Sequence, residues 1–95
     1  MKDLDLARRL RRMRRTVLML QTELRREHMD EPLLAEIDAQ MEHGIGTEPR
    51  CVQLPSLVDA LRESALSQRP EQFSDTVRAC EKLKDAIDEV VSLLG

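Results

Sequence analysis

An apolar stripe in the first third of the chain constrains the fold more than any other feature. Between residues 4 and 28, large apolar side chains recur at alternating steps of four and three residues, at Leu6, Leu10, Met13, Val17, Leu20 and Leu24. This spacing places them on one side of an α-helix that can pack against other helices, as in a coiled coil. The pattern predicts a long helix over residues 4–28, with Asp3 as its N-cap and Asp5 in its first turn.

The remainder of the chain also favours helices. Phe73 is the one aromatic residue among 95, so the core has to be built from aliphatic and methionine side chains, as is typical of helix packing. Turn and periodicity signals predict a short helix from Pro32 to Gly44, another beginning near Ser56, and a long final helix over residues 70–94. Residues 1–95 are therefore predicted to form a single all-α domain, a small bundle of two long and two short helices.

The final helix is predicted to carry an apolar stripe of its own, with Lys84 as its one polar interruption. We assign to this stripe Phe73, Val77, Cys80, Ile87, Val91 and Leu94, with Leu83 and Val90 widening it. An apolar face of this width needs two neighbouring helices to cover it. The stripe therefore favours a bundle over an isolated helix pair.

Residues 44–55 interrupt the helical pattern with two glycines and two prolines, which predicts a loop. It could be a simple crossover, anchored on the core by Ile45, Val52 and Leu54, or it could be a contact surface. Cys51 lies in this loop and is expected to be exposed, whereas Cys80 is expected to be buried. Because no secretory leader and no C-x-x-C motif is found, we expect free thiols in a cytoplasmic protein, with a redox role or a Cys51–Cys80 bridge as the alternative.

The net charge of −3 conceals a strong asymmetry along the chain. Residues 1–29 carry nine lysines and arginines against four acids, a balance of +5, and residues 30–95 carry six against fourteen, a balance of −8. Glu81 and Asp88 flank the stripe of the final helix and complement the arginines of the first. The two long helices are thus expected to attract each other, within one chain or between two chains. A homodimer is expected because Leu18 and Met19 extend the apolar surface of the first helix beyond one stripe.

Six arginines fall within eight residues of the first helix, between Arg8 and Arg15. Arginine pairs with phosphate, so one interpretation is binding to nucleic acid or to an acidic membrane surface. A solvated, ion-paired helix face is the favoured interpretation, because the chain is acidic overall and no aromatic side chains interleave with the arginines. If this helix binds a partner, the predicted contact residues are Arg8, Arg11, Arg12, Arg15, Leu18 and Met19.

No motif in the sequence indicates chemistry. No nucleophile has an evident base, no glycine-rich phosphate loop is present, and His28, His43, Cys51 and Cys80 lack the spacing of zinc ligands. No stretch is apolar enough to span a membrane. We therefore expect no enzyme, metal site or cofactor, but a module of the adaptor, chaperone or antiactivator type that binds another protein through an amphipathic or acidic helix. The alternative is a nucleic-acid-associated regulator that uses the arginine-rich helix.

Overall fold

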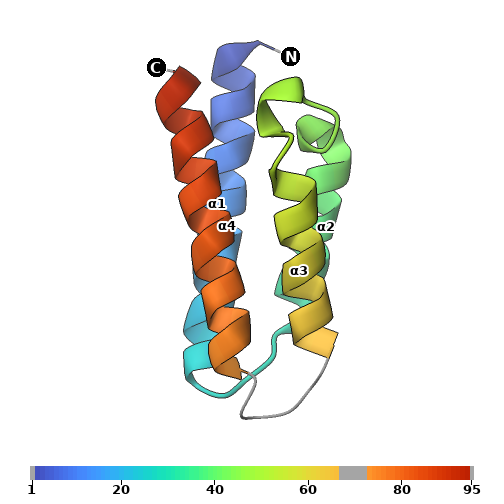
Figure 1. The fold of residues 1–95 in the computed structure, drawn as a ribbon, viewed down its shortest axis with the longest axis vertical. Helices are drawn as coiled ribbons and strands as arrows, with labels where there is room; N and C mark the ends of the chain where they lie inside the picture. Colours follow the sequence, from blue (N-terminus) through green and yellow to red (C-terminus); the bar gives the residue numbers. More distant parts are fainter. Residues whose placement is uncertain (1, 67–72, 95) are drawn as a thin grey trace.

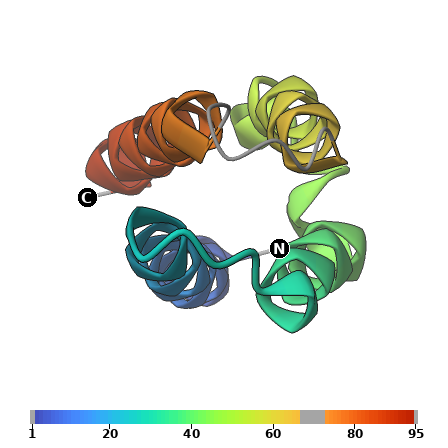
Figure 2. The same cartoon turned by 90° about the horizontal axis from the view of Figure 1, so that it is seen from below.

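The computed structural model describes residues 2–66 and 73–94, which form an antiparallel four-helix bundle. Its helices are α1 (Asp3–Arg25), α2 (Glu31–Gln40), α3 (Leu54–Leu66) and α4 (Phe73–Leu94). They run alternately down and up along a body of 40 × 19 × 19 Å (Figure 1) and occupy the corners of a square when viewed end-on (Figure 2). The predicted all-α bundle of two long and two short helices is confirmed, and dimerisation stays a prediction.

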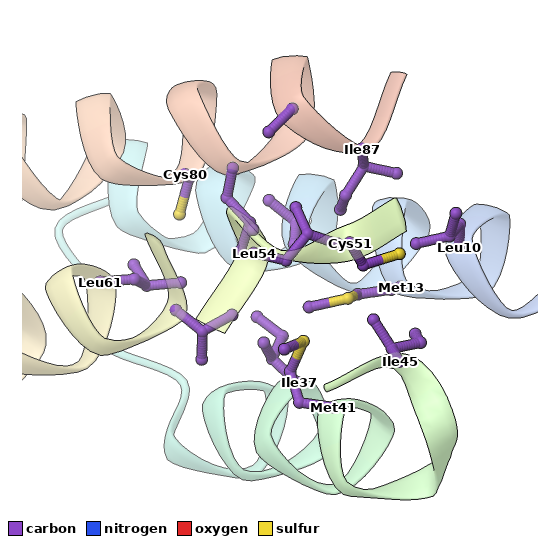
Figure 3. Close-up of a cluster of buried hydrophobic side chains, with 14 of the residues drawn as sticks. Leu10, Met13, Ile37, Met41, Ile45, Cys51, Leu54, Leu61, Cys80 and Ile87 are labelled. Carbon is purple, nitrogen blue, oxygen red and sulfur yellow. The ribbon is translucent and has the colours of Figure 1, made fainter. Parts of the chain in front are cut away.

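The apolar stripe of α1 lies in the core as predicted. Leu6, Leu10, Met13, Val17, Leu20 and Leu24 are each at most 1% exposed. Residues from all four helices meet them (Figure 3), among them Ile37, Met41, Leu54, Leu61, Cys80 and Ile87. The two long helices pair within the chain, because α1 lies against α4 as well as against α2.

The stripe predicted for α4 is confirmed in part: four of its eight residues are buried, and the other four are partly buried against the core. The buried residues of α4 are Thr76, Cys80, Leu83, Ala86, Ile87 and Val90, whereas Val77 and Val91 are only partly buried. Thr76 enters the core because its hydroxyl forms a 2.7 Å hydrogen bond with that of Ser64 on α3. Lys84 lies outside the core and pairs with Glu81 and Asp85 on its own helix.

The ends of α1 differ slightly from the predicted ones. Lys2, not Asp3, occupies the N-cap position, and it makes no side-chain capping hydrogen bond. At the other end, His28 N donates to Glu23 O (3.0 Å) and Glu27 N donates to Leu24 O (2.9 Å), the hydrogen-bond pair of a Schellman motif. The position that closes this motif is Glu27, with φ of 60°, so the helix ends earlier than residue 28.

The second helix follows its sequence signals at the start and departs from them at the end. Asp30 caps α2 by accepting a 3.1 Å hydrogen bond from the backbone N–H of Leu33. After Gln40 the chain continues into the turn η1 (Met41–Ile45), whose backbone leaves helical geometry at His43 and Gly44 and which buries both of its terminal residues. Gly44 has φ of 103° inside this turn, a conformation that strains any residue with a Cβ.

The predicted loop is more ordered than expected. It contains a short 3-10 helix, η2 (Pro49–Cys51), that folds Cys51 inward until it is 1% exposed. The expectation of an exposed Cys51 is therefore wrong. Ile45 and Leu54 anchor this segment in the core as predicted, at 1% and 0% exposure, whereas Val52 is 76% exposed. Helix α3 starts at Leu54 rather than near Ser56. The predicted beginning of the last helix at residues 70–72 lies outside the described residues.

Candidate functional site

Helix α1 has an outer face that points away from the bundle. We define it as the face formed by Arg8, Arg11, Arg12, Arg15, Leu18, Met19 and Thr22. It lies opposite the buried stripe because these positions are displaced from the stripe by about half a helical turn. The structure thus brings together all six residues that the sequence suggested as contacts for a partner. Four of them are exposed arginines, Met19 is 51% exposed, and Leu18 is half-buried.

Two neighbouring arginines contact other parts of the bundle instead. Arg14 reaches α4, where its Nε lies 2.7 Å from a carboxylate oxygen of Asp88. Arg9 points to the other side of α1 and donates a hydrogen bond to the backbone carbonyl of His43 at the end of η1. The charge attraction expected between the first and last helices is present, with Arg14 as the arginine that reaches α4.

The four arginines of the outer face have no such partners. Within residues 2–66 and 73–94, neither Arg8, Arg11, Arg12 nor Arg15 lies within ion-pair distance of a carboxylate. Many acids of the chain are engaged elsewhere: Asp38 pairs with Arg62, and both Asp3 and Glu48 pair with Arg50. The outer face of α1 therefore carries four exposed positive charges that this part of the fold leaves uncompensated.

A buried amide, which the sequence reasoning missed, links α1 to α4. Gln21 is 5% exposed, and its Nε2 donates to a carboxylate oxygen of Glu81 at 2.8 Å and to Val77 O at 3.4 Å. The hydrogen bond from Gln21 and the nearby charge of Lys84 lower the pKa of Glu81. Glu81 is thus engaged by an amide rather than by an arginine, contrary to its predicted pairing. The sequence feature that could have identified Gln21 is its position beside the apolar stripe, on the side of α1 that faces α4.

A small hollow opens where α1 meets η1. Arg9, Arg12, Gln40, His43 and Ile45 line it, and its volume is about 140 Å³. The amide of Gln40 donates to the hydroxyl of Thr16 at 3.2 Å, while its oxygen is buried and has no hydrogen-bond partner among the described residues. Because that oxygen has almost no accessible surface, a ligand in the hollow cannot reach it unless the side chain moves.

A second exposed apolar region lies at the end of the bundle where α1 begins and α4 ends. Val52 and Leu93 are 76% and 77% exposed and flank a groove between η2 and α4. Cys51 forms part of the wall of this groove, but burial raises the pKa of its thiol, so the reactive thiolate is disfavoured. Nothing about the groove indicates what covers it.

The described residues form no site for a metal. No group of three or more histidine, cysteine, aspartate or glutamate side chains among them could hold an ion. His28 follows the C-terminal end of α1, whereas His43 lies in η1 near the opposite end of the bundle (Figure 1). Cys51 and Cys80 are both buried free thiols.

None of the helices that the structure describes is long and apolar enough to cross a lipid bilayer. Comparison of the chain with protein-family models, with curated proteins and with solved structures gives no significant match.

Proposed function

We propose that this protein is a small, non-enzymatic interaction module of the adaptor, chaperone or antiactivator type. In this proposal the outer face of α1 binds an acidic amphipathic helix of another protein. The observation that carries the proposal is the set of four exposed arginines without acidic partners in the described fold, adjoining the exposed Met19 and the half-buried Leu18. An amphipathic acidic helix would neutralise the arginines and cover the apolar pair at once.

The two kinds of contact would contribute differently. Exposed ion pairs are worth about 0–1 kcal/mol each, so the arginines would mainly orient the partner and accelerate its association. Covering an exposed methionine or leucine contributes up to about 1.5–3 kcal/mol for full burial. Leu18 and Met19 would therefore supply much of the affinity, and the arginines would supply the choice of an acidic helix.

The same arginines support the second candidate, binding to nucleic acid. Arginine contacts phosphates, and such binding weakens steeply with rising salt, because the free energy gained by releasing the counterions condensed on the nucleic acid becomes smaller. Single-stranded nucleic acid also needs flat side chains on which bases stack, and Phe73, the one aromatic residue, is partly buried against the core at the start of α4. We therefore place the protein partner first.

The test is affinity capture from the source cell with three baits. The wild-type chain is compared with the double variant Arg11→Glu and Arg15→Glu, and with a matched control, Arg78→Glu and Lys82→Glu, which makes the same charge change at exposed positions of α4. We expect one protein to be retained by wild type and control and lost from the α1 variant. Capture of the same protein by all three baits would show that the outer face of α1 is not the binding surface.

Gel shifts with a short single strand and a short duplex of DNA at low salt separate the second candidate from the first. A complex that disappears with rising salt and requires Arg11 and Arg15 would support nucleic-acid binding. Absence of any shift, together with capture of a protein, would leave the protein-binding proposal standing alone.

A further inference from the structure

The outer face of α1 presents two successive holes of the kind that receives a side chain in helix packing. Four residues at positions i, i+3, i+4 and i+7 surround such a hole, and a side chain of the facing helix inserts into it. The arginine hole consists of Arg8, Arg11, Arg12 and Arg15, and the apolar hole consists of Arg15, Leu18, Met19 and Thr22. The two holes share Arg15, and their centres are one heptad apart, about 10.5 Å along the helix.

The arginine hole is chemically uniform. All four of its side chains are exposed, and none forms an ion pair with another residue of the described fold. Asp5 lines a hollow together with Arg8, Arg9 and Arg12, but it too makes no ion pair there. A carboxylate inserted into this hole would lie among four guanidinium groups. Carboxylates are the side chains that arginine pairs with most strongly, through charge-assisted and often bidentate hydrogen bonds.

The apolar hole is different in kind. Met19 and Leu18 form its two sides, and Met19 leaves half of its surface exposed. Thr22 is turned back on its own helix, because its hydroxyl donates a 3.0 Å hydrogen bond to the carbonyl of Leu18. This hole therefore offers an apolar partner side chain two apolar walls and no free polar group except Arg15.

From these two holes we infer the pattern of the partner helix: an acidic side chain and a large apolar side chain placed seven residues apart on one face. The acidic side chain enters the arginine hole while the apolar one enters the apolar hole. This inference rests on the proposed function and adds a spacing rule to it. A helix of the same composition in which the two side chains are five residues apart presents them on different faces and fills only one hole at a time.

A second copy of this chain also meets the rule, through Asp59 and Leu66 on α3, which are seven residues apart and exposed. However, α1 and α3 lie at diagonally opposite corners of the bundle (Figure 2). A contact of α1 with α3 of the next copy would leave the other two corners free and would propagate instead of closing into a dimer. We therefore assign the holes to a helix of another protein.

Three helical peptides of identical composition test the spacing rule on the full chain. The first carries two glutamates one turn apart and two leucines seven residues after them; the second reverses that order, because the partner can run in either direction. The third places the leucines five residues after the glutamates. Fluorescence anisotropy of the labelled peptides measures the dissociation constants. We expect one of the heptad-spaced peptides to bind about tenfold more tightly than the third, because it fills one further hole. A tenfold lower dissociation constant corresponds to about 1.4 kcal/mol of binding free energy.

Variants and controls keep the outcomes distinct. Arg12→Gln should weaken the best peptide, and Lys82→Gln on α4 should leave it unchanged. Equal binding of all three peptides, lost in Arg12→Gln, would overturn the spacing rule while the proposed function survived. No binding of any acidic peptide would overturn both. Self-association of the chain that Asp59→Lys abolishes would overturn the assignment to another protein.

Discussion

Arg14 on α1 and Asp88 on α4 form an ion pair across the seam of the two long helices, with 2.7 Å between Nε and the carboxylate oxygen. It is the one ion pair that joins these two helices within the described parts of the chain. Both side chains keep about two-fifths of their surface exposed, at 40% and 44%. The pair therefore fixes the register of the helices more than it stabilises them.

A double-mutant cycle with Arg14→Ala and Asp88→Ala should give a coupling energy of about 0.2–1 kcal/mol, because water and salt screen exposed ion pairs. The measurement is urea unfolding of the four proteins at low and high salt, with the coupling smaller at high salt. A coupling above about 2 kcal/mol would mean that the pair is far better shielded from solvent than its exposure indicates.

Glu27 occupies the left-handed position that ends α1, where glycine is preferred because it has no Cβ. Glu27→Gly should raise the free energy of unfolding by roughly 0.5–1 kcal/mol. Glu63→Gly inside α3 is the matched control and should lower it by about 1 kcal/mol. Chemical unfolding of both variants checks the two signs, and a loss of stability in Glu27→Gly would contradict the conformation described for this turn.

The pH dependence of stability should depend in part on Glu81. Gln21 and Lys84 lower the pKa of Glu81 in the folded chain below its unfolded value of about 4.3. Its contribution is therefore complete above that value and disappears as the pH falls through the folded pKa. The urea midpoint of the Glu81→Gln variant should fall less between neutral pH and about pH 3 than the midpoint of the wild-type chain, because the variant has no carboxylate to protonate at this position. A parallel fall in both proteins would show that the contact with Gln21 does not favour the charged carboxylate.

Both thiols should resist modification in the folded chain. Cys51 and Cys80 are at most 1% exposed, and burial raises the pKa of Cys80 to about 12, with a further contribution from the charge of Glu81. Labelling with a disulfide reagent at about pH 8 should be slower than in denaturant by about a hundredfold or more, because reaction requires opening of the bundle. Rapid labelling of Cys51 alone would show that η2 opens independently of the core.

The first helix could be predicted from sequence because its apolar core residues all obey one spacing. The full set of buried residues on α4 could not, because the apolar Val77 and Val91 are only partly buried whereas the polar Thr76 is buried. The hydroxyl of Thr76 forms a hydrogen bond with that of Ser64 on the neighbouring helix α3, a contact that the pattern of α4 does not indicate. Cys51 was misplaced for a related reason, since the turns that direct it inward form only against the core.

The residues of the outer face could be predicted from the sequence, but the lack of acidic partners for its arginines could not. Helical periodicity shows on which face of α1 each of the six arginines lies. Which of them find acids depends on how α1 sits between its neighbours: Arg14 pairs with Asp88, whereas Arg11 and Arg15 are exposed and form no ion pair with the described residues. The buried amide of Gln21 had only a weak signal, its position beside the stripe, because glutamine is mostly found on exposed surfaces.

The clustered arginines should cost the free chain stability. Arg11 lies within one helical turn of Arg8 and Arg15, and like charges at such spacings destabilise a helix by about 0.2–0.5 kcal/mol per pair. Arg11→Glu should therefore raise the free energy of unfolding at low salt, and the gain should shrink as salt is added. A clear loss of stability would show that Arg11 has a structural role in the isolated chain.

The dissociation constant of the complex rebuilt from the purified chain and its captured partner tests the central claim most directly. Calorimetry on the double variant Arg11→Glu and Arg15→Glu should show binding weakened by about a hundredfold or more, while the matched variant Arg78→Glu and Lys82→Glu binds as wild type does. Equal affinity of the two variants, with both folded, would contradict the assignment of the outer face of α1 as the partner-binding surface.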